Sequence, residues 1–297
     1  MSRRLHVLAA VSLLAAPAAA EPRLYDRWRA AAALAPASSP AQAADDWAAV
    51  PLRTGAHLPL NATQWHGKFR TTARAYNASL AVFDARDWSV ALPPSGCTKH
   101  SATSASARGA GCAYATNAGF FDFPPHAACE GNLALAGAVV QYLSPSRTNV
   151  AVNGSHALVG YSTSATVGAS AVSSLVSGLG WLVRGGAAYV KSAREYTPGN
   201  SFFTEWAPRT GAGWRADGAG LLLTVDGIEG TSAAAGADLF EFADLLIELG
   251  AVAAINLDGG GSTTATLHGN VYNSPHCADT WAVCERDVTS ITCVNGK

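Results

Sequence analysis

The amino-acid sequence predicts an α+β fold (mixed α/β), with a mixed β-sheet core that is flanked by helices and stapled by disulfide bonds. Three observations predict it: a strand–helix–strand pattern at residues 220–257, short apolar runs between turn residues elsewhere, and an even set of six cysteines. The 297 residues are 49% hydrophobic, with a formal net charge of −1. This composition supports a sizeable core, and it argues against disorder and against a nucleic-acid partner, which requires a positive surface.

The first 20 residues have the pattern of a secretory signal peptide. Arg3 and Arg4 precede an apolar run at residues 5–16, and small residues at 18–20 come before Glu21. The run is shorter than the roughly 20 apolar residues that a spanning helix needs, and no later segment approaches that length. We therefore expect a signal peptide at residues 1–20, no transmembrane anchor in this chain, and a protein that is soluble in the secretory pathway after cleavage. In that oxidising compartment the six cysteines most simply form three disulfide bonds.

Three sites for N-glycosylation agree with this compartment. Asn61, Asn77 and Asn153 each begin an Asn-x-Ser/Thr sequence, which is the acceptor of the modification. Each tripeptide alone arises easily by chance, and the signal peptide strengthens the prediction.

The remaining elements follow in chain order. Residues 21–64 are rich in Ala and Pro and have little periodicity, so we predict a linker or pro-segment, with a short helix around residues 25–34. The folded domain is expected at residues 65–297, and residues 93–111 predict a polar loop. Short apolar stretches predict strands or hairpins at residues 79–91, 112–117, 181–190, 263–272 and 288–294.

The clearest pattern is a βαβ unit at residues 220–257. The first strand, at residues 220–225, ends at Asp226, and the second, at residues 251–257, ends at Asp258. Between them, Asp238 and Glu241 form the N-terminal cap of a helix with an apolar stripe. Such a connection makes the two strands parallel, so both carboxylates lie at the same sheet edge, where α/β sheets bind ligands.

The sharpest local motif is Asp258-Gly-Gly-Gly-Ser262-Thr263. Consecutive glycines allow a steep turn and can point amide N–H groups at an anion, and the two hydroxyls add donors. Asp258 could act as a base, a nucleophile or a group that orients the ligand. The alternative interpretation of the motif is a flexible connection after a strand, without a functional role. Asp226 and Asp258 together suggest a two-carboxylate glycosidase, although Asp-Gly is also a common turn sequence.

Two other segments are candidates for substrate contacts. Arg209 can hold a phosphate or carboxylate with two hydrogen bonds, but many surface arginines have no such role. Asn117, with Phe120 and Phe121, offers the amide and aromatic groups that sugar recognition uses, although both rings can equally belong to the core. The eight histidines lack metal-site spacing, and the Gly-x-Ser-x-Gly motif of serine hydrolases is absent.

Several motifs, in this order, resemble the phosphodiester glycosidase family over residues 66–294. They are Asn117-Ala-Gly-Phe-Phe121, Cys129-Glu-Gly-Asn132, Gly180-Trp-Leu-Val-Arg184, Arg209-Thr-Gly-Ala-Gly213, Val225-Asp-Gly227 and Ile255-Asn-Leu-Asp-Gly-Gly-Gly-Ser-Thr263. The cysteine pattern near the C-terminus is similar as well. The resemblance implies a catalytic domain that removes N-acetylglucosamine from its phosphodiester to mannose on glycoproteins in the Golgi, which exposes mannose 6-phosphate. The sequence leaves two alternatives open: hydrolysis of another sugar-1-phosphodiester, and a non-catalytic, secreted carbohydrate-binding module.

The resemblance also implies site residues and a disulfide pairing. Asp258 and Asp226 would be catalytic, and the pairs would be Cys97 with Cys129, Cys112 with Cys293, and Cys277 with Cys284. The implied substrate-binding positions are Asn117, Gly119, Phe120, Phe121, Asn132, Arg209, Thr210, Gly227, Gly259, Gly260, Gly261, Ser262 and Thr263. We expect Asp258 to activate water or attack the sugar, and Asp226 to position a hydroxyl or water. These roles could be reversed. No metal or other cofactor is required by this scheme, and the oligomeric state is left open.

Overall fold

The computed structural model describes residues 45–123, 128–169, 172–228, 235–276 and 285–296. The predicted signal peptide, the predicted helix around residues 25–34 and the predicted disulfide between Cys277 and Cys284 lie outside these ranges. No helix within them combines the length and the apolar character that a bilayer crossing requires.

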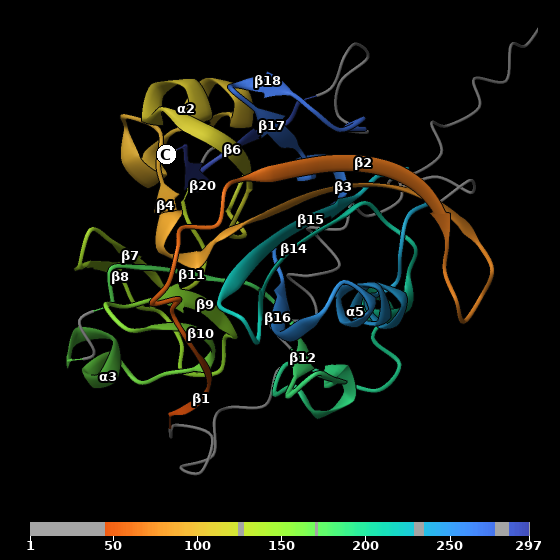
Figure 1. The fold of residues 1–297 in the computed structure, drawn as a ribbon, viewed down its shortest axis with the longest axis horizontal. Helices are drawn as coiled ribbons and strands as arrows, with labels where there is room; N and C mark the ends of the chain where they lie inside the picture. Colours follow the sequence, from red (N-terminus) through yellow and green to blue (C-terminus); the bar gives the residue numbers. More distant parts are fainter. Residues whose placement is uncertain (1–44, 124–127, 170–171, 229–234, 277–284, 297) are drawn as a thin grey trace, which may run out of the picture.

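Three antiparallel sheets form most of the described structure (Figure 1). The seven-stranded sheet has the order β13-β12-β16-β14-β15-β3-β2. Its strands are β2 (Asn61–Lys68), β3 (Ala75–Asp84), β12 (Trp181–Arg184), β13 (Ala187–Ala188), β14 (Arg209–Arg215), β15 (Ala219–Val225) and β16 (Ala251–Asn256).

The other sheets are smaller. A six-stranded sheet, in the order β1-β10-β9-β11-β7-β8, contains β1 (Asp46–Pro51), β7 (Leu133–Leu135), β8 (Ala138–Gln141), β9 (Asn149–Val152), β10 (His156–Tyr161) and β11 (Ser174–Ser177). A five-stranded sheet, in the order β18-β17-β6-β20-β4, contains β4 (Trp88–Ala91), β6 (Cys112–Asn117), β17 (Ala265–Leu267), β18 (Asn270–Val271) and β20 (Ile291–Asn295). A short pair joins β5 (Ser101–Ala102) to β19 (Asp287–Val288).

Four α-helices accompany these sheets in the described residues: α2 (Thr103–Ala110), α3 (Ser164–Ala169), α4 (Ser201–Thr204) and α5 (Leu239–Glu248). Short 3-10 turns are η2 (Ala85–Asp87), η3 (Gly96–Thr98), η4 (Val190–Ser192) and η5 (Gly260–Ser262). Strands and helices are both present, as the predicted class requires, but strands predominate. The prediction of a mixed sheet is wrong for the described residues, because all neighbouring strands in them are antiparallel.

The helix of the predicted βαβ unit forms as expected. Asp238 accepts hydrogen bonds from the N–H groups of Phe240 and Glu241, and the Glu241 carboxylate accepts one from the Asp238 N–H, which completes a capping box. The apolar face of α5, including Leu239 and Phe242, is buried in one cluster with residues of β15. Figure 1 shows α5 beside β16 and β12. The apolar stripe in the sequence therefore anchors α5 to the sheet.

The two strands of that unit are not neighbours. β14 lies between β15 and β16 and is antiparallel to both, so the two outer strands run in the same direction without sharing hydrogen bonds. Glycines allow this close approach: a Cβ added at Gly213 would lie 2.8 Å from the Ala254 Cβ. The insertion of β14 changes which strands are hydrogen-bonded, but the C-terminal ends of β15 and β16 still lie at the same edge of the sheet. Asp226 and Asp258 therefore both follow strands at the predicted edge.

Part of the predicted linker forms strands. β1 pairs with β10, and β2 pairs with β3 along its whole length, so strands occupy residues 46–51 and 61–64 of the predicted linker. β2 is partly exposed throughout, which hides the apolar alternation that identifies a strand. The predicted polar loop at residues 93–111 is also wrong, because it contains α2. The buried side of α2 carries Thr103, Ser104 and Ser106 in place of an apolar stripe.

A buried carboxylate holds the segment between β1 and β2 to the seven-stranded sheet. Asp84, at the end of β3, accepts hydrogen bonds from Arg86 Nε at 2.7 Å and Nη2 at 2.6 Å, and from the Leu58 N–H at 3.1 Å. Its side chain is fully buried. Hydrogen bonding to Arg86 holds the pKa of Asp84 well below its ordinary value of 3.8.

We expect Asp84→Asn to lower the free energy of unfolding by about 2–3 kcal/mol at pH 7, because charge-assisted hydrogen bonds are lost. A lowered folded-state pKa adds stability that is complete above pH 3.8 and is lost as the pH falls through the folded-state value. The difference in the free energy of unfolding between the wild type and the variant should therefore be smaller at pH 3 than at pH 7. Urea denaturation at both pH values measures this difference. A difference that stays constant with pH would contradict a lowered pKa of Asp84 in the folded state.

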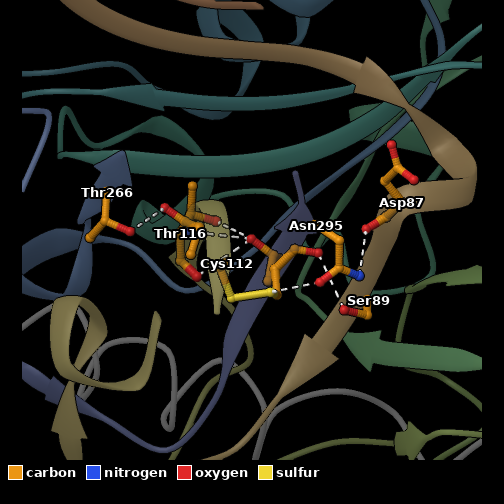
Figure 2. Close-up of a disulfide and its surroundings, with 9 residues drawn as sticks. Asp87, Ser89, Cys112, Thr116, Thr266 and Asn295 are labelled. Carbon is orange, nitrogen blue, oxygen red and sulfur yellow. Dashed lines mark hydrogen bonds between the residues drawn. A yellow bond between two sulfur atoms is a disulfide. The ribbon is translucent and has the colours of Figure 1, made fainter. Parts of the chain in front are cut away.

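The two disulfide bonds in the described residues are those that the family resemblance implied. Cys97 pairs with Cys129 and Cys112 pairs with Cys293, with Cα–Cα distances of 5.1 and 5.3 Å. Figure 2 shows the second bond joining β6 to β20, beside the hydrogen bond from Asn295 Nδ2 to the Asp87 carbonyl. This bond braces the strand that leads to Asn117.

Apolar side chains from all three large sheets share one main hydrophobic core, which includes Val50 from β1, Phe83 from β3 and Trp88 from β4. The predicted glycosylation sites lie outside it. Asn61 on β2 and Asn77 on β3 are exposed, and Asn153 is partly exposed in the turn between β9 and β10. These positions are compatible with the predicted modification.

Candidate active site

Several of the residues singled out in the sequence, including both aspartates, lie where the ends of β6 and β15 and the start of β14 approach the loop after β16. We call residues 258–263 of that loop the glycine loop. Asn117, fully buried at the end of β6, donates from Nδ2 to the Asp258 carbonyl at 2.7 Å. Its Oδ1 accepts from Thr210 Oγ1 at 2.8 Å and from the Thr264 N–H at 3.2 Å. Asn117 therefore ties the first residue of the glycine loop, and the residue that follows the loop, to β14.

Asp258 is held at the start of the loop. Its N–H donates to the Ala118 carbonyl at 2.9 Å, and its Oδ1 accepts from the Gly259 N–H at 2.9 Å. The residue is only 7% exposed. The backbone and one carboxylate oxygen are thus fixed before any substrate arrives, as a catalytic carboxylate requires.

The glycine loop closes into the 3-10 turn η5. Gly260 has a φ of 59°, a left-handed conformation that favours glycine. Most loop amides bond within the protein: Gly260 N–H to the Pro208 carbonyl at 2.8 Å, Ser262 N–H to Gly259, and Thr263 N–H to Gly260. Those amides therefore do not form the anion cradle that the glycines suggested. The hydroxyl of Thr263 is buried and has no hydrogen-bond partner among the described residues.

Asp226 follows β15 and is connected to the glycine loop by Asn273. Asn273 Nδ2 donates to Asp226 Oδ1 at 2.9 Å and to the Thr263 carbonyl at 3.1 Å. The Ser274 N–H also donates to Asp226 Oδ1, at 3.2 Å. Burial raises the pKa of Asp226 above its ordinary value, and the bonds from Asn273 and Ser274 oppose that rise. The two predicted catalytic carboxylates thus belong to one hydrogen-bonded assembly.

Two residues of this assembly have no signal in the sequence. Asn273 follows the β17–β18 hairpin without a motif that marks it. Arg286 is 5% exposed, with Nη1 at 3.4 Å from Ser262 Oγ and its guanidinium 5.5 Å from the ring of Phe123. Only the fold brings these side chains to the glycine loop.

The predicted aromatic contacts belong to the core. Phe120 is 2% and Phe121 is 1% exposed, and they lie in two different hydrophobic clusters. The Phe121 ring packs edge-on against His100, with 4.7 Å between ring centres. Of the two alternatives that the sequence left open, the structure favours packing over sugar contact, because neither ring is accessible.

Arg209 is positioned differently from the phosphate-binding arginine that we predicted. It is fully buried, its Nε donates to the Ala237 carbonyl at 3.0 Å, and its Nη2 donates to the carbonyls of Phe202 and Glu205. These bonds hold α4 and the start of α5 to β14. We therefore assign Arg209 a structural role in this conformation.

Three further predicted contacts also shape the backbone. Asn132 Oδ1 accepts from the N–H groups of Leu143 and Ser144, and the residue is 1% exposed. The Gly119 N–H donates to Ser290 Oγ at 3.0 Å. A Cβ added at Gly227 would lie 2.0 Å from the Ala235 carbonyl oxygen, so only glycine fits beside Asp226. These contacts fix the backbone around the site.

Metal-binding groups are not clustered in the described ranges. No set of three or more His, Cys, Asp or Glu side chains in these ranges could hold a metal ion.

Known proteins resemble this chain over most of its length. N-acetylglucosamine-1-phosphodiester alpha-N-acetylglucosaminidase from Bos taurus is 32% identical over 270 residues, which cover 84% of this chain and 50% of the bovine protein. The Homo sapiens protein of the same name is 31% identical over 246 residues, which cover 76% of this chain and 47% of the human protein. The chain therefore spans about half the length of the curated relatives that it matches.

Solved structures show the same fold. The zebrafish N-acetylglucosamine-1-phosphodiester alpha-N-acetylglucosaminidase catalytic domain, auto-inhibited by its pro-peptide, matches with a TM-score of 0.74 and 24% identity. The match covers 86% of this chain and 89% of that one. A hypothetical protein from Synechocystis matches with a TM-score of 0.61 and 14% identity, over 85% of this chain and 68% of that one. The model of the phosphodiester glycosidase family matches residues 110–295, well over half of the sequence. The chain belongs to the phosphodiester glycosidase family.

Proposed function

We propose that this protein hydrolyses N-acetylglucosamine from its phosphodiester linkage to the 6-position of mannose on glycoproteins, which exposes mannose 6-phosphate. The names of the bovine and human relatives support this substrate. The observation that carries the proposal is the junction at the sheet edge, where Asn273 joins Asp226 to the loop that begins at Asp258. A pair of organised carboxylates is the chemical equipment of a glycosidase.

The leaving group determines what the site must supply. A phosphate monoester, whose second pKa is about 6, departs with less need of a general acid than a sugar hydroxyl. The reaction then needs a carboxylate at the anomeric carbon. Asp258 takes the proton of a water whose oxygen bonds to that carbon, while the bond from carbon to phosphate oxygen breaks and its electron pair leaves with the phosphate. Asp226 accepts a hydrogen bond from a sugar hydroxyl or the water.

A covalent route is the second way for Asp258 to act. Its carboxylate attacks the anomeric carbon, the phosphate leaves with the electron pair, and water then hydrolyses the glycosyl ester. The stereochemistry of the released sugar separates the two routes, because direct attack by water inverts the anomeric centre and the covalent route retains it.

The phosphate needs positive and polar groups near the glycine loop. Arg286 is the arginine beside Ser262, whereas the side-chain bonds of Arg209 go to main-chain carbonyls. The hydroxyls of Ser262 and Thr263 are further donors of the loop. Fixed donors of this kind stabilise charge that develops on a leaving phosphate.

We expect the purified protein to release free N-acetylglucosamine from a methyl mannoside that carries N-acetylglucosamine-1-phosphate on its 6-oxygen. A panel of other sugar-1-phosphodiesters, assayed in parallel, measures the specificity. Faster release of a different sugar would reassign the substrate. Binding of the glycan without release of any sugar would instead indicate a carbohydrate-binding module.

The proposed setting is the lumen of the secretory pathway, either in the Golgi or after secretion. The two disulfide bonds of the described residues form in such a compartment and are rare in the cytosol. The exposed sequons on β2 and β3 are accessible to glycosylation there.

A further inference from the structure

Asn273 makes three hydrogen bonds at the junction of the two predicted catalytic segments. Its Nδ2 donates to Asp226 Oδ1 at 2.9 Å and to the Thr263 carbonyl at 3.1 Å. Its Oδ1 accepts from the Ala265 N–H at 2.8 Å. The side chain, at 9% exposure, is therefore enclosed and used at both ends.

These bonds determine which way the amide faces. The Ala265 N–H can only donate, so it must meet the amide oxygen. The Nδ2 group then has its two hydrogens directed to the Asp226 carboxylate and the Thr263 carbonyl, both of which can only accept. The reverse orientation would set donor against donor and oxygen against oxygen. Asn273 therefore cannot flip without losing all three bonds.

The carboxylate of Asp226 is consequently asymmetric. Oδ1 accepts from Asn273 and from the Ser274 N–H, whereas Oδ2 accepts no hydrogen bond from the described residues. The side chain of Asp226 is partly exposed, so Oδ2 is the oxygen that can meet a ligand.

We propose that Asn273 is a positioning residue for the phosphodiester hydrolysis: it anchors Oδ1 of Asp226, leaves Oδ2 for substrate or water, and fixes Asp226 relative to the glycine loop. The proposal rests on the proposed function, because it gives Asp226 a role in that reaction. One amide that bridges a carboxylate and the loop carrying the second carboxylate makes their separation a property of the fold. A side chain held in this way needs no reorganisation in the transition state.

The electrostatic surroundings of Asp226 make the contribution of Asn273 to its pKa measurable. Burial raises the pKa of Asp226, and the Asn273 and Ser274 N–H groups stabilise its ionised form. The titratable group that faces it from β6 is Tyr114, whose pKa is raised by burial, so the phenol stays neutral in assay conditions. Tyr272 packs edge-on against Tyr114 at 6.1 Å.

Asn77 on β3 connects the main chain of Asp226 to a titratable side chain on β2. The Asp226 N–H donates to the Asn77 carbonyl, and Asn77 Oδ1 lies 2.6 Å from His66 Nδ1. Neither His66 nor a tyrosine donates to the Asp226 carboxylate, so removing the Asn273 amide removes one of its two donors. The pKa of Asp226 should therefore rise in variants that lack this amide.

The test compares Asn273→Ala, Asn273→Asp and the control Asn270→Ala. Asn270 is exposed on β18, and its side-chain amide donates to the His268 carbonyl. We expect kcat to fall about 10- to 100-fold in both Asn273 variants, with little change in KM and none in the control. Because Asp226 must be ionised to accept a hydrogen bond or a proton, the acidic limb of the pH profile should move to higher pH. This shift of the acidic limb should be larger for Asn273→Asp, because that variant places a second carboxylate against Asp226.

Asn273→Asp also guards against loss of folding, because its carboxylate can still accept from the Ala265 N–H. A direct titration of Asp226 separates the role of Asn273 from the substrate assignment. Carboxyl carbon-13 NMR of aspartate-labelled protein follows that titration, with the resonance identified by its absence in Asp226→Asn.

A rise of the titration midpoint in Asn273→Ala, with the loss of kcat, supports the proposal. An unchanged midpoint and an unmoved pH profile would overturn it and leave Asn273 a purely structural residue. If the wild type hydrolyses no sugar phosphodiester while the midpoint still rises, the proposed function fails, whereas the hold of Asn273 on Asp226 stands.

Discussion

Asp258→Asn should reduce kcat for release of N-acetylglucosamine by about 1,000-fold or more, while the protein stays folded. The amide oxygen of Asn can still accept from the Gly259 N–H, and the main-chain bonds to Ala118 and Asn117 do not involve the side chain. What is lost is the negative charge that takes a proton or attacks the sugar, and loss of an essential catalytic group costs this order of magnitude. Steady-state kinetics and circular dichroism measure the two effects.

Asp217→Asn is the matched control. Asp217 lies in the turn between β14 and β15, at the opposite end of β15 from Asp226, and its side chain is 50% exposed. The same chemical change should therefore leave kcat within about twofold of the wild type, as surface substitutions have small effects. Activity of Asp258→Asn close to that of Asp217→Asn would remove Asp258 from the chemistry and transfer the catalytic role to Asp226.

Removing the Cys112–Cys293 bond should have the largest effect on stability. The bond closes a segment with a sequence separation of 181, and the loss of chain entropy in the unfolded state grows with that separation. The double variant Cys112→Ala/Cys293→Ala is expected to lose about 5 kcal/mol of unfolding free energy. Both cysteines are buried between β6 and the last strand, where the surrounding hydrogen bonds depend on the strands remaining side by side (Figure 2).

The other disulfide bond provides the comparison. Cys97–Cys129 has a sequence separation of 32, so the variant without it should lose about 3–4 kcal/mol. Urea denaturation of both double variants under identical conditions tests the order. A larger loss from the Cys97–Cys129 variant would show that loop length does not determine the contribution of these bonds.

The local elements with a regular apolar pattern could be predicted from the sequence. The α5 cap at Asp238 and Glu241 has the expected reciprocal bonds, since its signal lies within four consecutive residues. β6 and β15 were recognised because nearly continuous apolar runs mark fully buried strands. β2 and α2 were missed because β2 is largely exposed and the buried side of α2 is mostly polar. β1 was missed although residues 47–50 are apolar, because it lies in a segment rich in Ala and Pro that favoured a linker.

The candidate site could be predicted only in part. Asp226 and Asp258 follow strands whose ends share an edge, and strand direction alone places them there. Arg209 and Arg286 show the limit of this reasoning. An arginine is chemically suited to phosphate in either position, but Arg209 faces main-chain carbonyls and Arg286 faces Ser262.

The sequence by itself determined the secretory pattern, the two carboxylates, the glycine loop and, through the family motifs, the pairing of Cys112 with Cys293. The first three depend on short motifs or on periodicity, both of which are local, whereas the cysteine pairing came from the resemblance to the family. The tertiary structure decided that β14 separates β15 from β16 and that Phe120 and Phe121 are core residues. It also decided that Asn273 connects Asp226 to the glycine loop. Contacts between distant residues depend on strand order and register, and no local pattern in one sequence specifies them.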